Sequence, residues 1–299
     1  MAKILSGKEL AEKMRGEMKT EIERLKSQCN LVPGLAVVLV GDDPGSISYV
    51  TGKEKACAEI GILSRGYKFD AEYKESALLK LIDELNHDNS IHGILVQLPL
   101  PDHINEEKIL YAIDPDKDVD GFHPVNIGKM IAGKETFLPC TPHGVVQLLL
   151  RSGVKIDGAD VVIVGRSNIV GKPLANMLIQ KSPTGNATVT ICHTRTKNLA
   201  EHTRRAEILI VAAGHPKAVT IDMVKEGAVV IDVGVNRIED KTKATGYRLV
   251  GDVDFETVKE KASLITPVPG GVGPMTITML LYNTVKAAKK SLAGLLKNS

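Results

Sequence analysis

Short apolar runs alternate with helix-compatible segments along the chain, and this alternation constrains its fold more than any other feature. Residues 35–40 and 93–98 are apolar runs that end at turn residues or prolines. Residues 46–60 and 78–85 lie between them and have the length and spacing of helices. Strands that alternate with helices pair in parallel, because a crossover must return the chain to the same end of the sheet. The alternation therefore predicts a layered α/β fold.

The alternation extends to both ends of the chain. Residues 6–9 have the S-x-x-E form of a helix capping box, and apolar residues then recur at helical spacing as far as Leu25. A short strand is expected near Tyr67. A second α/β unit is expected to begin at Asp160. Its predicted strands and the final helix are 161–164, 187–192, 208–212, 229–233, a strand around Leu249, and a helix over 274–292.

Length and a polar junction indicate two domains. With ~150 residues per domain as a prior, 299 residues correspond to about two domains. Residues 114–143 are polar and rich in turn-forming residues, as at a domain boundary, and a helix over residues 143–150 is expected to cross it.

Composition argues against several classes of protein. Lys and Arg number 38 and Asp and Glu 36, so the net charge of +2 gives no general reason to bind nucleic acid or a membrane surface. No apolar run approaches the ~20 residues of a membrane span, and the first residues lack the pattern of a secretory signal. The four cysteines and eight histidines show no metal-ligand spacing, and Cys140 is expected to pack. These features favour a cytoplasmic enzyme without a metal site.

A glycine-rich turn follows the apolar run 161–164. Gly165 and Gly171 bound this turn, and a helix-compatible segment comes next. A strand, a tight glycine turn and a helix N-terminus together offer backbone N–H groups to a phosphate. The spacing is not G-x-G-x-x-G, and a plain strand-to-helix turn is the alternative.

The end of the next predicted strand indicates which dinucleotide would bind. His193, Thr194 and Arg195 stand where NAD sites place a carboxylate, and Arg166 lies in the glycine turn itself. Guanidinium and hydroxyl groups would hold the additional phosphate of NADP, which a carboxylate would repel. We therefore expect NADP, with a merely solvated basic rim as the alternative.

Polar residues of the first half form a second candidate site. Tyr49 and Lys53 are four residues apart, so they share one face of the predicted helix. Gln97 ends a predicted strand, where parallel sheets meet ligands, and Asp120 lies in the polar junction. Burial and a neutral neighbour such as Gln97 would favour a lysine base. An exposed surface pair is the alternative. A short-chain dehydrogenase is disfavoured because its Tyr-Lys pair follows the glycine turn.

Six motifs occur in the order typical of one enzyme family. The chain resembles the bifunctional methylenetetrahydrofolate dehydrogenase/methenyltetrahydrofolate cyclohydrolases. The residues that carry this resemblance run from one end of the chain to the other, and the last motif contains Pro-Gly-Gly-Val-Gly-Pro-Met-Thr. They are residues 49–57, 97–101, 117–121, 139–142, 165–171 and 266–276.

The resemblance implies a fold and two reactions. It implies a folate-binding domain over residues 1–139, completed by the C-terminal helix 274–299, that faces a Rossmann NADP-binding domain over 140–273 across a cleft. It also implies a homodimer formed mainly through the Rossmann domains. The expected reactions are oxidation of 5,10-methylenetetrahydrofolate with NADP+ and hydrolysis of the methenyl product to 10-formyltetrahydrofolate.

The resemblance also implies roles for residues of the folate side. Lys53 would be the general base or proton shuttle, and Gln97 would orient it and tune its pKa. Tyr49 would stack on the folate, and Asp120 would bind the amino-pyrimidine edge of the pterin. The remaining residues expected to contact the substrate are Leu98, Pro99, Pro269, Gly270, Gly273 and Thr276.

On the cofactor side, Arg166 and Thr194 would bind the additional phosphate of NADP, with Arg195 nearby. Thr194 stands where the family has Ser, and it keeps the hydroxyl group. The other residues expected to contact the cofactor are Gly165, Ser167, Val170, Gly171, His193, Ala213, Gly214, Val233, Gly234, Gly271, Gly273 and Thr276.

Two alternatives remain beside this family. Shikimate and amino-acid dehydrogenases share the two-domain layout, but they do not account for the motif over 97–101 or the C-terminal glycines. A non-catalytic NADP-binding module is disfavoured by the intact set of Lys53, Gln97 and Asp120. Because relatives without the lysine lose the cyclohydrolase, both activities are expected.

Overall fold

The computed structural model describes residues 1–243 and 246–298, with side chains as far as residue 294. The chain forms two compact units. One contains Met1–Ala11 and Thr141–Thr276, and we call it the six-stranded unit. The other contains Glu12–Cys140 and the C-terminal segment from Ile277, and we call it the three-stranded unit. The divisions fall within the helices α1 (Gly7–Cys29), α6 (Cys140–Arg151) and α10 (Val272–Asn298).

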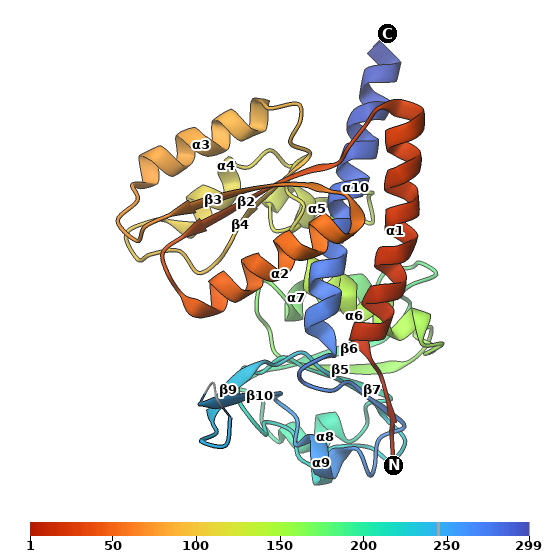
Figure 1. Ribbon diagram of the computed structural model, residues 1–299. Coiled ribbons are helices and arrows are strands. Elements are labelled where there is room, and N and C mark those ends of the chain that lie inside the picture. The colour runs from red at the N-terminus through yellow and green to blue at the C-terminus, as the bar shows by residue number, and fades with distance from the viewer. Residues whose placement is uncertain (244–245, 299) are drawn as a thin grey trace. The chain divides into compact units, whose positions relative to one another are not determined.

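A parallel sheet of order β3-β2-β4 forms the centre of the three-stranded unit. Its strands are β2 (Gly34–Val40), β3 (Leu63–Phe69) and β4 (Gly93–Val96). Every residue of β2 and β4 is buried, as expected of a strand covered on both faces. The helix α2 (Pro44–Ile60) lies on one face of the sheet and α3 (Glu75–His87) on the other (Figure 1).

The start and end of α2 follow from local sequence. The Asp43 carboxylate accepts a hydrogen bond from the Ser46 N–H at 2.7 Å, and Pro44 occupies the first turn. Gly61 ends the helix with a φ of 88°, a conformation that glycine adopts without strain. The short helices α4 (Glu106–Ala112) and α5 (Pro124–Ile131) follow β4. The Lys289 ammonium of α10 donates to Glu21 of α1 at 2.8 Å.

The six-stranded unit contains a parallel sheet of order β1-β11-β8-β7-β5-β6. The helices α6 and α7 lie on one face of this sheet, and α8 and α9 lie on the other (Figure 1). This arrangement confirms the predicted fold class. The elements are β1 (Lys3–Ile4), β5 (Asp160–Val164), α7 (Gly171–Leu178), β6 (Thr188–Cys192), α8 (Leu199–Thr203), β7 (Ile208–Val211), η1 (Ile221–Met223), β8 (Val229–Asp232), α9 (Phe255–Val258) and β11 (Leu264–Ile265).

The structure differs from the sequence-based description at both ends of this sheet. Leu249 lies in β10 (Tyr247–Val250), which pairs antiparallel with β9 (Asn236–Glu239) outside the main sheet. The strands β1 and β11 were not predicted, and their mutual pairing places residues 1–11 in the six-stranded unit. The predicted first domain began at residue 1, so this assignment differs from it.

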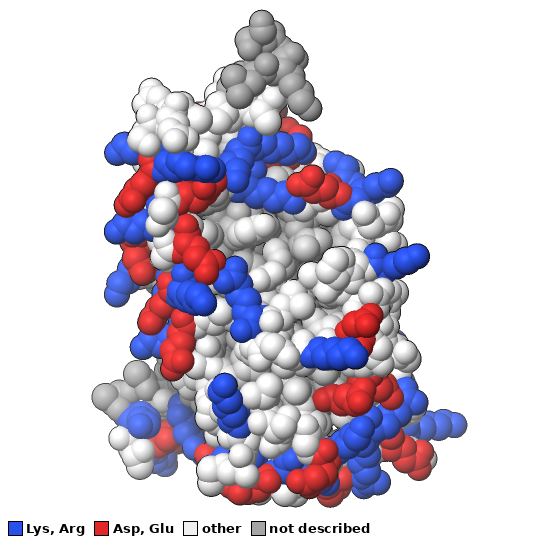
Figure 2. Space-filling model, turned by 90° about the vertical axis from the view of Figure 1, so that its right-hand side faces the viewer, with Lys and Arg blue, Asp and Glu red and all other residues white. Residues whose placement is uncertain are grey.

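Charged side chains of both signs are mixed on the surface. Figure 2 shows Lys and Arg interspersed with Asp and Glu mainly along the margins of the face that it displays, whereas the middle of that face is mostly uncharged. Among the described residues, no helix is both long and apolar enough to cross a membrane.

Candidate active site

A buried lysine and a strand-end glutamine meet in the three-stranded unit. Lys53 lies on α2 with only 8% of its surface exposed, whereas Tyr49, one turn earlier, is 43% exposed. The Lys53 ammonium donates to the Gln97 Oε1 at 2.9 Å. Gln97 directly follows β4, and its Nε2 donates to the Leu98 carbonyl at 2.7 Å. Because the second bond orients the amide, Gln97 presents its oxygen to Lys53.

Burial and one nearby carboxylate shift the pKa of Lys53 in opposite directions. Burial lowers the pKa of Lys53, because the ammonium loses hydration, and the Asp120 carboxylate acts against this effect. Burial likewise raises the pKa of Asp120, while the Lys53 charge lowers it. The result is a lysine whose pKa lies below its usual range beside a carboxylate that limits the shift.

A second carboxylate shapes the loop that carries Asp120. Asp118 is buried, and its oxygens accept from the Gly121 N–H at 3.1 Å and the His123 N–H at 2.8 Å. Asn126 adds an amide donor at 2.8 Å. Gly121 has a φ of 78°, and a Cβ there would lie 2.6 Å from the Pro139 nitrogen. Asp118 therefore positions this loop, a role that the sequence analysis did not assign.

Two further buried residues support the same loop. The Asn283 amide of α10 donates to the Val119 carbonyl at 2.8 Å and to the Leu138 carbonyl at 3.0 Å. Cys140 is buried, and burial together with the Asp120 charge raises the pKa of its thiol well above the usual range. Such a thiol stays protonated, as expected for the packing role predicted from sequence. Sequence reasoning missed Asn283, although an amide in an apolar helix is a usable signal.

The glycine turn after β5 is a backbone cradle. Gly165 has a φ of 136°, and a Cβ there would lie 2.2 Å from the Ala212 carbonyl oxygen. A Cβ at Gly171 would lie 2.1 Å from the Gly165 carbonyl oxygen. Only glycine fits at both positions, and α7 begins at the second of them. The Ser167 hydroxyl accepts from the Val170 N–H at 3.1 Å and closes the turn.

Basic and hydroxyl side chains flank this cradle. Val164 of β5 and Cys192 of β6 are paired, so the turns after the two strands are neighbours. Arg166, Thr194 and Arg195 are exposed there. The His193 Nδ1 accepts from the Arg195 N–H at 3.1 Å, which orders the backbone after β6. The donors fit an additional phosphate, and the glycine cradle fits a pyrophosphate.

The other predicted cofactor residues follow the remaining strands of the sheet. Ala213 and Gly214 follow β7, and Val233 and Gly234 follow β8, so all four lie at its carboxyl edge. This is the edge at which open α/β sheets bind ligands.

The C-terminal motif comes after β11. Gly271 is buried, and a Cβ there would lie 2.5 Å from the Pro267 carbonyl oxygen. Gly270 has a φ of 102°. The peptide bond between Val268 and Pro269 is cis. The peptide bond between Leu98 and Pro99 in the other unit is also cis. The Thr276 hydroxyl is hydrogen-bonded to the Thr141 hydroxyl at 2.9 Å. Gly273 lies in the first turn of α10.

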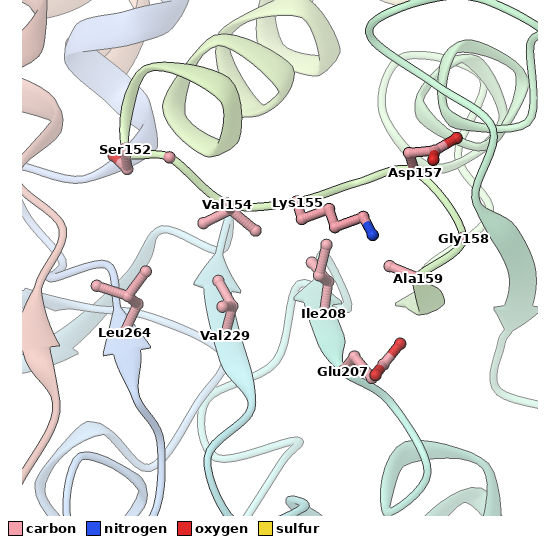
Figure 3. Close-up of a pocket in the computed structure, with 11 residues that line it drawn as sticks. Ser152, Val154, Lys155, Asp157, Gly158, Ala159, Glu207, Ile208, Val229 and Leu264 are labelled. Carbon is pink, nitrogen blue, oxygen red and sulfur yellow. The ribbon is translucent and has the colours of Figure 1, made fainter.

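A cavity of about 500 Å³ lies at the opposite edge of this sheet. Ile208, Val229 and Leu264, the first residues of β7, β8 and β11, line it together with Lys155 (Figure 3). The phosphate cradle is at the carboxyl ends of the strands, so this cavity is separate from the cofactor edge.

Comparisons with known proteins assign both units to one family. Residues 5–120 match the model of the tetrahydrofolate dehydrogenase/cyclohydrolase catalytic domain, and residues 139–292 match that of the family's NAD(P)-binding domain. The chain is 61% identical over 292 residues to the bifunctional protein FolD of Syntrophus aciditrophicus, which is 98% of this chain and 99% of the relative.

Solved structures of the same family resemble this chain over nearly its whole length. The bifunctional FolD enzyme of Campylobacter jejuni is 52% identical with a TM-score of 0.91, over 97% of this chain and 100% of that one. The FolD enzyme of Trypanosoma brucei, solved with NADP and an inhibitor, is 39% identical with a TM-score of 0.92, over 97% of this chain and 98% of that one. The chain therefore belongs to the tetrahydrofolate dehydrogenase/cyclohydrolase family and is a bifunctional NADP-dependent enzyme of folate one-carbon metabolism.

Proposed function

We propose that Lys53 is the general base of the cyclohydrolase step. The observation that carries this proposal is the buried ammonium bonded to the neutral amide of Gln97. The neutral amine of Lys53 accepts a proton from water as the water oxygen bonds to the methenyl carbon. Lys53 then returns this proton to the folate nitrogen whose bond to that carbon breaks. The hydroxyl proton of the adduct leaves to solvent as the formyl C=O forms, and 10-formyltetrahydrofolate results.

Gln97 and Asp120 adjust this base without replacing it. A neutral amide accepts one N–H of Lys53 without adding a charge that would hold the proton, so the burial of the ammonium still lowers the pKa of Lys53. The Asp120 carboxylate matches the adjacent N–H donors of the pterin's amino-pyrimidine edge. Its charge also stabilises the protonated lysine that forms during hydrolysis.

The exposed ring of Tyr49 completes the folate side. It lies one helical turn from Lys53 on α2, and a large part of its surface remains available for stacking. The other residues that we propose as substrate contacts are Leu98 and Pro99 of the three-stranded unit and Pro269, Gly270, Gly273 and Thr276 of the six-stranded unit.

The carboxyl edge of the six-stranded sheet is the proposed cofactor site. When bound, NADP supplies the hydride acceptor for the dehydrogenase step. Gly165 and Gly171 leave room for the pyrophosphate, and Arg166 with Thr194 binds the additional phosphate. Arg195 adds positive charge beside them. The residues named above at the ends of β7 and β8 and after β11 contact the rest of the cofactor.

A coupled assay tests this assignment of function. The purified protein is given 5,10-methylenetetrahydrofolate with NADP+ or NAD+, and reduced cofactor and methenyl intermediate are followed together. We expect reduction with NADP+ and little accumulation of the methenyl intermediate. Absence of reduction with either cofactor would contradict the dehydrogenase assignment.

We also propose that the chain forms a homodimer through the edge of the six-stranded sheet. β6 is an edge strand, and Ile191 on it and Ile179 after α7 are exposed apolar residues. An unpaired apolar edge favours pairing with a second copy. Sedimentation of the wild type and of Ile191→Glu checks this: a dimer that the substitution leaves intact would contradict the proposed edge.

We further propose a cytoplasmic location. The four cysteines are free thiols, and three of them are buried. Unpaired thiols are typical of proteins in a reducing compartment. Fractionation of cells that contain the tagged chain would test this proposal.

A further inference from the structure

Two buried carboxylates lie beneath the carboxyl edge of the six-stranded sheet. Asp232 is the last residue of β8 and is 2% exposed, and Asp252, two residues after β10, is fully buried. Buried carboxylates are normally balanced by a cation or a metal. The hydrogen-bond partners of these two are instead backbone N–H groups and one side-chain amide.

Asp252 holds the loop that follows β7. Its Oδ2 accepts from the Ala213 N–H at 2.7 Å and from the Gly214 N–H at 2.8 Å. Its Oδ1 accepts from the Asn236 amide at 2.8 Å. Ala213 and Gly214 are themselves exposed, so one buried carboxylate fixes the direction of an exposed loop.

Asp232 holds the turn that follows β8 and also holds Asp252. Its Oδ1 accepts from the Gly234 N–H at 3.1 Å and the Asp252 N–H at 2.9 Å, and its Oδ2 accepts from the Val253 N–H at 2.9 Å. The two carboxylates thus connect the loops after β7, β8 and β10 into one network.

Two glycines allow the backbone to pass the carboxylates at this distance. A Cβ at Gly234 would lie 2.1 Å from the Asp252 Cγ, and a Cβ at Gly251 would lie 1.8 Å from the Asp232 Oδ2. No other residue type fits at either position. Burial and the charge of Asp252 raise the pKa of Asp232 to about 7, so the arrangement is unfavourable for the charged carboxylate.

We propose that Asp232 and Asp252 are positioning residues that set the backbone of residues 213–214 and 233–234 for cofactor binding. The proposal rests on the proposed cofactor site, since these two loops belong to it. Both side chains are buried, so they would act on the cofactor through the backbone that they hold. The backbone N–H groups of residues 213, 214 and 234 donate to these carboxylates, and charge-assisted bonds of this kind are strong.

The test compares Asp252→Asn with the exchange variant Asp252→Asn/Asn236→Asp. In the single variant two amides face each other. The new side chain can keep its oxygen on the N–H groups of residues 213 and 214 only if Asn236 turns its own oxygen toward residue 252, and neutral contacts then replace the charge-assisted bonds. In the exchange variant the acceptor and donor trade places and the loop bonds can form again. Asp222→Asn, at an exposed carboxylate of the same unit, is the control.

The measured quantities are NADPH affinity by its fluorescence, kcat and KM of the dehydrogenase, and hydrolysis of methenyltetrahydrofolate. We expect Asp252→Asn to weaken NADPH binding by about tenfold, the size of one lost charge-assisted bond. KM for NADP+ should rise more than kcat falls, and hydrolysis should stay at the wild-type rate. The exchange variant should restore the affinity for NADPH to within about twofold of the wild type, because it can form as many hydrogen bonds to the loop as the wild type does.

Three outcomes would overturn the proposal. They are unchanged NADPH affinity in Asp252→Asn, an equal loss of both activities, and an exchange variant that binds no better than the single variant. If the single variant does not fold, wild-type affinity in a folded exchange variant still supports the proposal and a weakened affinity overturns it. Failure of the wild type itself to bind NADPH would instead contradict the proposed cofactor site.

Discussion

The folate side and the cofactor side use buried charge in different ways. In the three-stranded unit the buried ammonium of Lys53, which we propose as the hydrolytic base, donates to the neutral amide of Gln97. In the six-stranded unit the buried carboxylates of Asp232 and Asp252 accept hydrogen bonds from backbone N–H groups and thereby hold loops. A buried charge whose hydrogen-bond partner is neutral thus suits proton transfer, and a buried charge that several backbone N–H groups bind suits the positioning of loops.

This contrast predicts that the two activities separate by mutation. Lys53→Met removes the base, and we expect hydrolysis of methenyltetrahydrofolate to fall by roughly 10²- to 10⁴-fold. NADPH affinity should be unchanged, because the residues that we propose to bind the cofactor belong to the other unit. Lys55→Met, at an exposed lysine two positions along the same helix, is the matched control. Hydrolysis that survives in Lys53→Met would remove this lysine from the mechanism.

The cofactor side should show a smaller and more selective effect. Arg166→Ser should raise KM for NADP+ by roughly 10- to 100-fold, because it removes a charge-assisted bond to the additional phosphate. KM for NAD+ and the hydrolysis rate should change little. Arg204→Ser, at another exposed arginine of this unit, serves as the control. Equal losses with both cofactors would show that Arg166 does not select the phosphate.

A charge added beside Lys53 should move the pH dependence of hydrolysis. In Gln97→Glu a carboxylate would face the ammonium, and this opposite charge would raise the pKa of Lys53. The neutral base is then scarcer at a given pH, so the rising limb of the rate profile shifts to higher pH. The Lys53→Met/Gln97→Glu double variant should lack this limb. A profile that does not move would contradict the coupling of the two residues.

The smallest effect concerns stability and Asp232. Its folded-state pKa of about 7 lies above the ordinary value near ~3.9, so between these values the folded state binds more protons than the unfolded state. Stability from this group is present at low pH and is lost as pH rises toward 7. Asp232→Asn should flatten the dependence of Tm on pH across this window, whereas Asp222→Asn should not. An unchanged slope would place the Asp232 pKa near its ordinary value.

The sequence predicted the parts of the fold that have strong local signals. The strands β2, β5 and β7 are apolar runs that can be recognised in the sequence, and their alternation with helices predicted the fold class that the structure confirms. β1 and β11 have two residues each, so only pairing with distant partners makes them strands. Leu249 has a strand-like environment, but its partner is β9 rather than the parallel sheet.

The candidate site divides in the same way. Tyr49, Lys53 and Gln97 were predicted because a helical spacing and a strand end mark them, and the structure joins Lys53 to Gln97. Asp232 and Asp252 were missed because their partners are backbone groups up to 39 positions away. Acidic residues are normally exposed, so composition alone gave no reason to bury these two.

The state of Lys53 is the claim on which the comparison depends most. Lysines labelled with ¹³C at the Cε position are titrated by NMR in the whole protein, and the resonance missing in Lys53→Met identifies Lys53. The account predicts that the pKa of Lys53 in the wild type lies below the ordinary lysine value of about 10.4. It also predicts that the pKa of Lys53 is higher in Gln97→Glu than in the wild type. A pKa at or above the ordinary value would leave Lys53 charged at neutral pH and would contradict its role as the base.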